Sequence, residues 1–310
     1  MIEIITLGTG SAVPTRFRNL SATAMFRNGD IYLFDCGEGT QIQLRRAGLR
    51  PGRLKKIFIS HFHGDHIFGL PGLLTSLQMA ECSQQITLYG PEGLRSFVEF
   101  HKSFSGFTLN YPLEIVEVEN SSSAGEFKEK GLTIKCLPLK HRMRNLGWAI
   151  IEDDRPGKFN AVRAKELNIP SGPLFSKLQN GDDIILDDGT KIFSKEVVGP
   201  KRKGHHVAYC LDTAPCDASI ELARNADILI HDATFFSKND KMAAISGHST
   251  VAEAAEIAAR ADVRKLILTH FSARTVPEDE EQMLAEAQLH FPNVEIARDL
   301  GRYSIDYIDE

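Results

Sequence analysis

The segment SHFHGDH, residues 60–66, constrains this chain more than any other, because it places four metal-binding side chains within a few positions. They are His61, His63, Asp65 and His66. The segment directly follows KKIFIS, which has the composition of a buried strand. Imidazole and carboxylate groups suit Zn²⁺, and their short spacing on a loop lets them converge on an ion. The cluster therefore predicts a metal site at the carboxyl end of a strand.

Strand-like and helical segments alternate on both sides of this cluster. Strands are expected at residues 2–7, 22–26, 30–35, 55–60, 85–90, 205–212, 227–233 and 265–270. Helices are expected at residues 38–47, 66–80, 92–104, 214–226, 249–261 and 277–291. Between these two parts, residues 113–152 have mainly a strand pattern, with a turn at 121–125. Two similar α/β halves predict an α/β fold of the four-layer αββα sandwich type, formed by a single domain over residues 1–310.

One stretch breaks the alternation. Residues 154–181 are rich in Pro and Gly and hold only a short helical pattern, AVRAKEL. We expect an excursion from the domain here, and composition alone is also compatible with an ordinary mobile surface loop.

The bulk composition excludes several classes of protein. No apolar run approaches the roughly 18 residues that span a bilayer, so no membrane association is expected. The first residues, MIEIITLGTG, lack the pattern of a secretion signal and are expected to form a strand. The five scattered cysteines predict neither a disulfide framework nor a cysteine zinc site, which favours a cytoplasmic setting. The net charge of −5 argues against a nucleic-acid partner, although basic residues cluster at 45–56 and 201–203.

The pattern HxHxDH resembles the signature of the metallo-β-lactamase superfamily, and the similarity extends over nearly the whole chain. The resemblance implies three further ligands, each after a later strand: His141, Asp212 and His270. It implies a first site of His61, His63 and His141, a second site of Asp65, His66 and His270, and a bridging Asp212. Two Zn²⁺ ions per subunit are expected, and the same ligands would accept Mn²⁺ or Co²⁺. Such a pair of ions activates a shared water and suits phosphodiester or carbonyl hydrolysis.

Within the superfamily the chain resembles ribonuclease Z, the family of endoribonucleases that process transfer RNA 3′ ends. PTRFRN is similar to the PxKxRN loop of that family, with Arg16 where Lys is usual, and FDCGEGTQIQL and GHST resemble two further segments. The resemblance implies removal of the 3′ trailer from precursor tRNA by metal-hydroxide attack. A 3′-hydroxyl would remain on the tRNA and a 5′-phosphate on the trailer. A homodimer is also implied.

The resemblance also assigns roles other than metal binding. Asp65 and His248 are expected to be catalytic, with His248 protonating the leaving 3′-oxygen. The stretch at 154–181 is similar to the flexible arm, or exosite, that clamps tRNA. Candidate tRNA contacts are Arg16, Arg18, Asn19, Lys158, Arg163 and Lys165. Asp35 is expected to orient metal ligands.

Other interpretations remain open at this point. His248, taken alone, could simply cap the following helix. The same metal cluster could hydrolyse a small ester, lactone, sulfate ester or cyclic nucleotide, and a non-catalytic RNA-binding module would lack some of the ligands. None of the expected ligands is missing, and PTRFRN, GHST and the arm favour the endoribonuclease.

Overall fold

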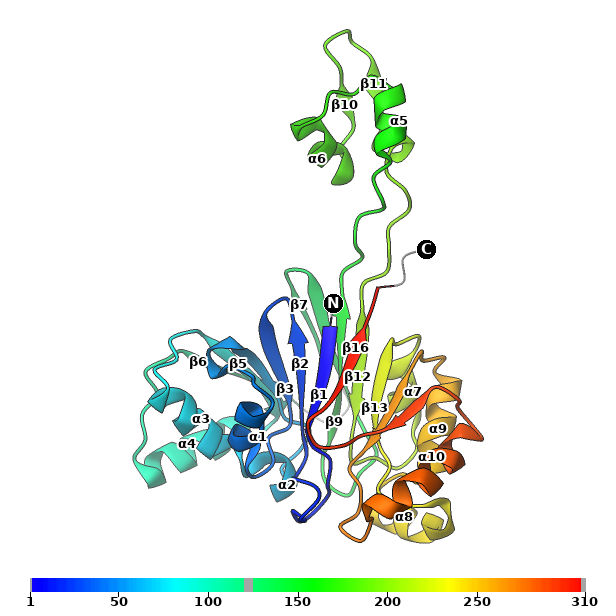
Figure 1. Ribbon diagram of the computed structural model, residues 1–310. Coiled ribbons are helices and arrows are strands. Elements are labelled where there is room, and N and C mark those ends of the chain that lie inside the picture. The colour runs from blue at the N-terminus through cyan, green and yellow to red at the C-terminus, as the bar shows by residue number, and fades with distance from the viewer. Residues whose placement is uncertain (1, 120–124, 308–310) are drawn as a thin grey trace. The chain divides into compact units, whose positions relative to one another are not determined.

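The computed structural model describes residues 2–119 and 125–307 (Figure 1). The turn expected at 121–125 lies almost entirely outside these described residues. Contacts divide the chain into two units. The first unit comprises Met1–Ile151 and His206–Asp306, and the second comprises Glu152–His205 with Tyr307–Glu310.

The first unit contains two seven-stranded sheets. One has the order β16-β1-β2-β3-β4-β5-β6, and its strands are β16 (Gly301–Ile305), β1 (Ile2–Gly8), β2 (Ala22–Arg27), β3 (Asp30–Phe34), β4 (Leu54–Phe58), β5 (Ile86–Pro91) and β6 (Leu113–Val118). The other has the order β15-β14-β13-β12-β9-β8-β7, and its strands are β15 (Val294–Ile296), β14 (Leu266–Thr269), β13 (Ile228–Asp232), β12 (His206–Cys210), β9 (Leu146–Glu152), β8 (Leu132–Pro138) and β7 (Gly125–Glu129). Strands β3 to β6 are parallel, as are β12 to β15. The carboxyl ends of each parallel set therefore meet at one edge of their sheet.

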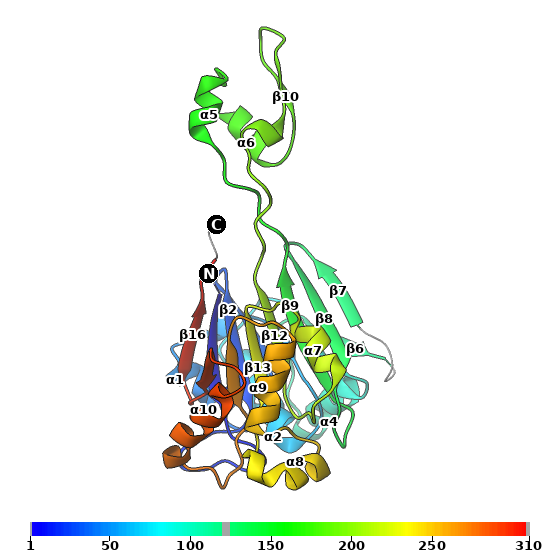
Figure 2. The ribbon, with the colours of Figure 1, turned by 90° about the vertical axis from the view of Figure 1, so that its right-hand side faces the viewer.

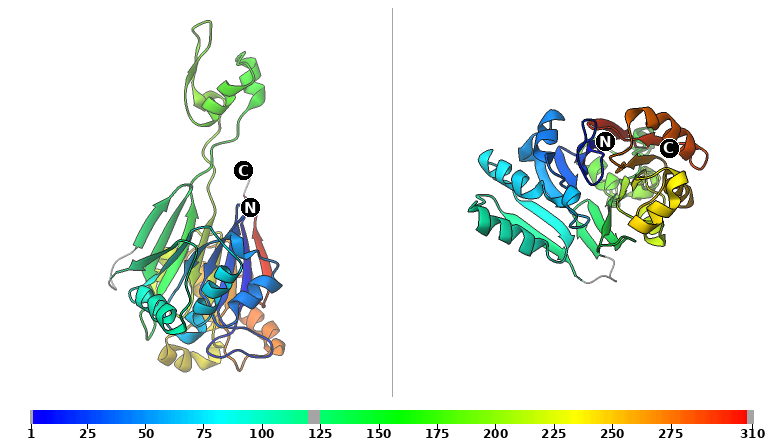
Figure 3. Two further views of the ribbon diagram at one scale, coloured as in Figure 1. Left: turned by 90° about the vertical axis from the view of Figure 1, so that its left-hand side faces the viewer. Right: turned by 90° about the horizontal axis from the view of Figure 1, so that it is seen from below.

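Helices cover the outer faces of both sheets (Figures 1 and 2). On the first sheet they are α1 (Thr40–Arg46), α3 (Leu70–Met79) and α4 (Leu94–Ser105), and on the second α7 (Asp217–Ala223), α9 (Val251–Arg260) and α10 (Glu280–Gln288). The inner faces pack on each other through aromatic rings, with Phe34 stacked on Tyr209 at a centroid distance of 5.0 Å. These layers, also visible in Figure 3, confirm the four-layer αββα sandwich.

The first unit also has the short helices α2 (Gly64–Ile67) and α8 (Asp240–Ser246), with 3₁₀ turns at Pro51–Arg53, Ser237–Asn239 and Pro277–Asp279. A further 3₁₀ turn, Ser194–Glu196, belongs to the second unit. The single helix expected at 66–80 is thus divided into α2 and α3. Gly69 lies at the break, where a Cβ atom would be 2.0 Å from the carbonyl oxygen of Gly37, and Pro71 follows in the first turn of α3. None of the described helices combines the length and hydropathy needed to cross a membrane.

The second unit has a small apolar core of its own. It contains α5 (Ala161–Glu166), α6 (Pro173–Gln179), β10 (Ile184–Ile185) and β11 (Lys191–Ile192). Ala164 and Leu178 pack there with Ile184, Ile192 and Val197. The excursion expected at 154–181 lies within this unit, which continues to His205 because the later residues complete its core.

Candidate metal centre

The loops at the carboxyl ends of four strands bring the seven expected ligands together. His61, His63, Asp65 and His66 follow β4, His141 follows β8, Asp212 follows β12 and His270 follows β14. Asp212 and His270 lie in the left-handed region, with φ of 50° and 63°. Such a backbone conformation costs on the order of 1–3 kcal/mol per residue and persists where the surrounding structure enforces it. Asn145 contributes to this, because its Nδ2 donates to the carbonyl oxygens of Leu211 and Asp212 at 2.7 Å.

Three histidines and Asp212 form the first group. His61 Nε2 lies 2.8 Å from His63 Nδ1 and 3.4 Å from Asp212 Oδ2. His141 Nε2 lies 3.3 Å from His63 Nδ1 and 3.8 Å from Asp212 Oδ2. Burial, and then the charge on His66, lower the pKa of His61 to about 4. The first group therefore presents neutral imidazole nitrogens to a common point.

Asp65, His66 and His270 form the second group, on the other side of Asp212. The Nε2 atoms of His66 and His270 lie 3.1 Å apart, and each is 3.5 Å from Asp65 Oδ2. Asp212 Oδ1 lies 3.1 Å from the former and 3.0 Å from the latter. Asp212 thus directs one carboxylate oxygen to each group.

The two groups fit a pair of divalent cations. Asp212 Oδ1 is buried and accepts no well-aligned hydrogen bond from the described residues, although two ring nitrogens face it. Burial alone would lower the pKa of His270, but the carboxylates of Asp212 and Asp65 raise it to about 10. In the same way the pKa of His66 is raised well above its ordinary value. Protons on these two rings balance the carboxylates when no cation does, and the N and O donors are those that Zn²⁺ accepts.

A layer of hydrogen bonds behind the ligands fixes their orientation. Asp35, at the end of β3, is fully buried, and its Oδ2 lies 2.8 Å from His66 Nδ1. Ser60 and Tyr209 donate to the same oxygen, each at 2.9 Å. His66 therefore turns its Nε2 toward Asp212. Asp35 has the orienting position that the sequence led us to expect.

Hydrogen bonds with residues that are not ligands also orient His141, His270 and Asp65. His141 Nδ1 donates to the carbonyl oxygen of Gly247 at 2.8 Å, and Thr234 Oγ1 lies 3.1 Å from His270 Nδ1. The backbone N–H of Ala12 donates to Asp65 Oδ2 at 2.7 Å. Three separate segments thus determine where the ligand atoms point.

His248 lies beside both groups, with its ring centroid 5.1 Å from that of His141 and 5.3 Å from that of His270. Its Nδ1 lies 2.8 Å from Asp232 Oδ2, a carboxylate buried at the end of β13. Burial would lower the pKa of His248, but Asp232 outweighs this effect and the pKa is raised. His248 does not cap the following helix. The N-cap of α9 is Thr250, whose side chain forms a capping box with Glu253.

Asp232 is a residue of the centre that sequence reasoning missed. Besides His248, it binds Thr234 Oγ1 at 2.6 Å and the backbone N–H of Thr213 at 3.1 Å. The available signal was the pair of polar residues His231 and Asp232 at the end of the strand DILIHD, at the same sheet edge as Asp212 and His270.

The candidate tRNA contacts lie in two places. Arg16 and Asn19 belong to the loop before β2, where Arg16 is exposed and Asn19 half-buried. Lys158, Arg163 and Lys165 are exposed on the second unit.

Arg18 does not fit the expectation of a direct contact. It is only 4% exposed, and its terminal nitrogens bond to Thr9, Glu280 and the carbonyl oxygen of Ala297. Because these internal partners use the guanidinium, Arg18 is not presented to a substrate.

Comparisons with known proteins agree with this geometry. A family model described as the anti-Pycsar protein Apyc1 matches residues 2–151, and one described as a β-lactamase superfamily domain matches residues 190–271. Ribonuclease Z of Acaryochloris marina is 42% identical, with 98% of each chain covered. Ribonuclease Z of Geobacillus kaustophilus is also 42% identical, over 98% of this chain and 99% of the relative.

Solved structures lead to the same family. The short form of human tRNase Z superposes with a TM-score of 0.71 at 28% identity, with 98% of this chain and 99% of that chain covered. A metallo-β-lactamase fold protein from Bacillus subtilis has a TM-score of 0.68 at 19% identity, over 97% and 98% of the two chains, which shows the fold alone. On the strength of the full-length relatives, this chain belongs to the ribonuclease Z family of endoribonucleases.

Proposed function

We propose that this protein removes the 3′ trailer from precursor tRNA in the cytoplasm, by zinc-dependent hydrolysis of one phosphodiester bond. One observation carries the proposal. Six candidate metal ligands from three loops converge around the seventh, Asp212, and the buried pair His248–Asp232 lies beside them. The full-length relatives named ribonuclease Z and the human tRNase Z structure support the choice of substrate.

Two divalent ions would be held by the groups described above. His61, His63 and His141 would hold one, Asp65, His66 and His270 the other, and Asp212 would bridge them. When bound, such ions supply Lewis acidity and make water acidic enough to ionise near neutral pH.

The protein's own side chains divide the proton transfers between them. Burial would raise the pKa of Asp65, but the charges on His66 and His270 hold it well below its ordinary range. Asp65 is therefore ionised, and we infer that it accepts a hydrogen bond from the attacking water. His248 engages Asp232 through Nδ1, so its Nε2 is the atom that would donate a proton to the leaving 3′-oxygen.

Contacts with the tRNA backbone would come from two surfaces. Arg16 and Asn19 belong to the loop whose Ala12 donates to Asp65, and we propose that they contact the tRNA near the cleaved bond. Lys158, Arg163 and Lys165 are the arm's candidates for phosphate contacts, which position a nucleic acid without reading its sequence.

We also propose a homodimer that associates through the exposed side of α4. Phe100 and Phe104 are 60% and 82% exposed there, and their rings stack at 5.7 Å. Met79, at the end of the neighbouring α3, is 79% exposed. Sedimentation equilibrium should give a dimer mass for the native chain and a monomer mass for the double variant Phe100→Ser/Phe104→Ser. A native monomer would contradict the proposal.

The decisive experiment for the function is cleavage of precursor tRNA by the purified protein, with and without a chelator. We expect one cut at the 3′ end, a 3′-hydroxyl on the tRNA, and loss of cleavage on chelation that is restored by Zn²⁺. Metal-dependent hydrolysis of a small ester, lactone or cyclic nucleotide, with intact precursor tRNA, would favour the other class of hydrolase.

A further inference from the structure

The loop from Thr9 to Asn19 is tied to the metal centre at three points. Ala12 donates its backbone N–H to Asp65 Oδ2 at 2.7 Å. Ser11 donates to the carbonyl oxygen of Phe271 at 3.0 Å, and Phe271 donates to the carbonyl oxygen of Thr9 at 2.9 Å. Phe271 directly follows His270. The segments that carry two candidate ligands therefore anchor one side of this loop.

Arg18 holds the same loop from its other side. One terminal nitrogen donates to Thr9 Oγ1 at 2.8 Å and to the carbonyl oxygen of Ala297 at 2.9 Å. The other donates to Glu280 Oε1 at 2.7 Å. The guanidinium lies over the ring of Phe271, with its carbon 4.5 Å from the ring centroid. One buried side chain thus joins the loop to α10, to the end of β15 and to the residue after His270.

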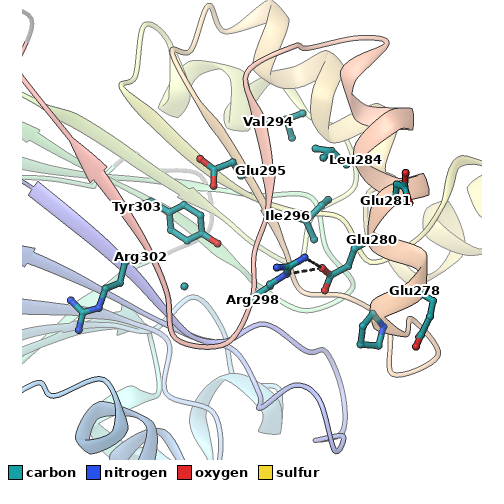
Figure 4. Close-up of a pocket in the computed structure, with 12 residues that line it drawn as sticks. Glu278, Glu280, Glu281, Leu284, Val294, Glu295, Ile296, Arg298, Arg302 and Tyr303 are labelled. Carbon is teal, nitrogen blue, oxygen red and sulfur yellow. Dashed lines mark hydrogen bonds and ion pairs between the residues drawn. The ribbon is translucent and has the colours of Figure 1, made fainter.

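The partners of Arg18 are themselves held in place. Arg298 approaches Glu280 Oε2 with two nitrogens at 2.7 Å (Figure 4). With Arg18 on Oε1, Glu280 therefore bridges two guanidinium groups. Asp299 accepts from the backbone N–H of Thr9 at 3.1 Å and from that of Asn19 at 2.7 Å. Both ends of the loop are therefore fixed to residues 297–299. A buried ion pair of this kind specifies a geometry, since loss of one partner leaves the other charge uncompensated.

We propose that Arg18 is a positioning residue, whose ion pair with Glu280 holds the loop Thr9–Asn19 in the register that seats the tRNA 3′ end against the metal centre. The inference rests on the proposed function. Arg18 itself touches no substrate. It acts through the exposed Arg16, which belongs to the same loop. A small phosphodiester needs no seating by the loop and should react independently of Arg18.

The test compares Arg18→Gln and Glu280→Gln with a control Arg–carboxylate pair elsewhere in the protein. Arg264→Gln removes another Arg–carboxylate contact of 2.7 Å, to the buried Asp227, outside this network. For each zinc-loaded protein we measure the cleavage positions, KM and kcat on precursor tRNA. We also measure the rate of hydrolysis of bis(p-nitrophenyl) phosphate and the amount of bound zinc. Hydrogen exchange of a peptide covering residues 8–20 reports the loop directly.

Arg18→Gln should raise KM for precursor tRNA about 10- to 100-fold and spread the cut over neighbouring nucleotides, because small misplacements near reacting atoms carry such costs. Hydrolysis of the small ester and zinc content should stay within about twofold, and exchange of the loop peptide should rise. Glu280→Gln, which keeps the side-chain volume, should change KM and the cleavage pattern in the same direction. The double variant should have the same KM as Arg18→Gln, since substitutions of two residues that contact each other are non-additive.

Two results would overturn the inference. One is a folded Arg18→Gln protein with native KM, one cleavage position and unchanged exchange. The other is an equal loss with both substrates. If Arg18→Gln does not fold, Glu280→Gln decides by the same measurements. Failure of the native protein to cut precursor tRNA would refute the proposed function instead, and the exchange experiment would still report whether Arg18 fixes the loop.

Discussion

The metal centre and the second unit use charge in opposite ways. At the centre, buried carboxylates such as Asp35, Asp212 and Asp232 each bind specific partners at about hydrogen-bonding distance. In the second unit a small apolar core carries Lys158, Arg163 and Lys165 on its exposed surface. Removal of one buried charge leaves its partners uncompensated, whereas exposed charges are screened and contribute in small, similar amounts. The centre should therefore respond sharply to single substitutions and the second unit gradually.

The sharpest response is expected at Asp212, which faces both groups. Asp212→Ala should lower kcat/KM about 10³-fold or more on precursor tRNA and on bis(p-nitrophenyl) phosphate alike, because the main electrostatic element of the site is lost. Bound zinc, measured by atomic emission, should fall as well. Full zinc content with native rates would refute the bridging position of Asp212.

His248 should affect the reaction without affecting the metals. His248→Ala should lower kcat about 10²- to 10⁴-fold, the usual contribution of a general acid. Its zinc content should equal that of the native protein. Loss of zinc, or full activity, would remove His248 from the proposed role.

The pH dependence of kcat tests whether Asp232 controls the proton on His248. Since Asp232 raises the pKa of His248, Asp232→Asn should let His248 lose its proton at lower pH. The alkaline limb of the kcat profile should therefore move to lower pH, with a fall in kcat of about tenfold near pH 8. An unchanged limb would mean that another group supplies the proton.

The second unit as a whole should matter for tRNA alone. The backbones of Arg155 and Arg202 form a β-bridge close to where the chain enters and leaves this unit. Residues 156–201 can therefore be replaced by a short Gly linker. The shortened protein should lose about 100-fold in kcat/KM on precursor tRNA, since remote binding energy supports catalysis. It should hydrolyse bis(p-nitrophenyl) phosphate at the native rate. An equal loss on both substrates would speak against a tRNA-binding role.

Single charges of the second unit should give the smallest effects. Substitution of Lys158, Arg163 or Lys165 by Ala should each reduce the slope of log K against log[salt] by about 1, as one phosphate contact is removed. Filter binding at several salt concentrations measures this slope. A native slope in the triple variant would place the phosphate contacts elsewhere.

Much of the fold could be predicted, because the signals for strands and helices are local. The periodicity around KKIFIS and KLILTH gave the sandwich and placed the candidate ligands at strand ends. The break at Gly69 was not predictable from periodicity, since it depends on the approach of Gly37 from a distant loop. The extent of the second unit was also missed, because composition marks only residues 154–181, whereas its core needs Ile184, Ile192 and Val197.

By itself, the sequence determined which residue types stand after which strands, and hence a metal-dependent hydrolase of a recognisable family. Only the tertiary structure decided which of these residues meet. Asp232 reaches His248 because the chain after β13 pairs with the segment before α9, at Phe235 and Thr250. Arg18 belongs to a loop similar to one that contacts the substrate in the family, yet its side chain is buried. The pairing of β1 with β16 brings Glu280 and Ala297 against it. Contacts between segments far apart in the chain depend on how the two sheets close, and no local pattern records that closure.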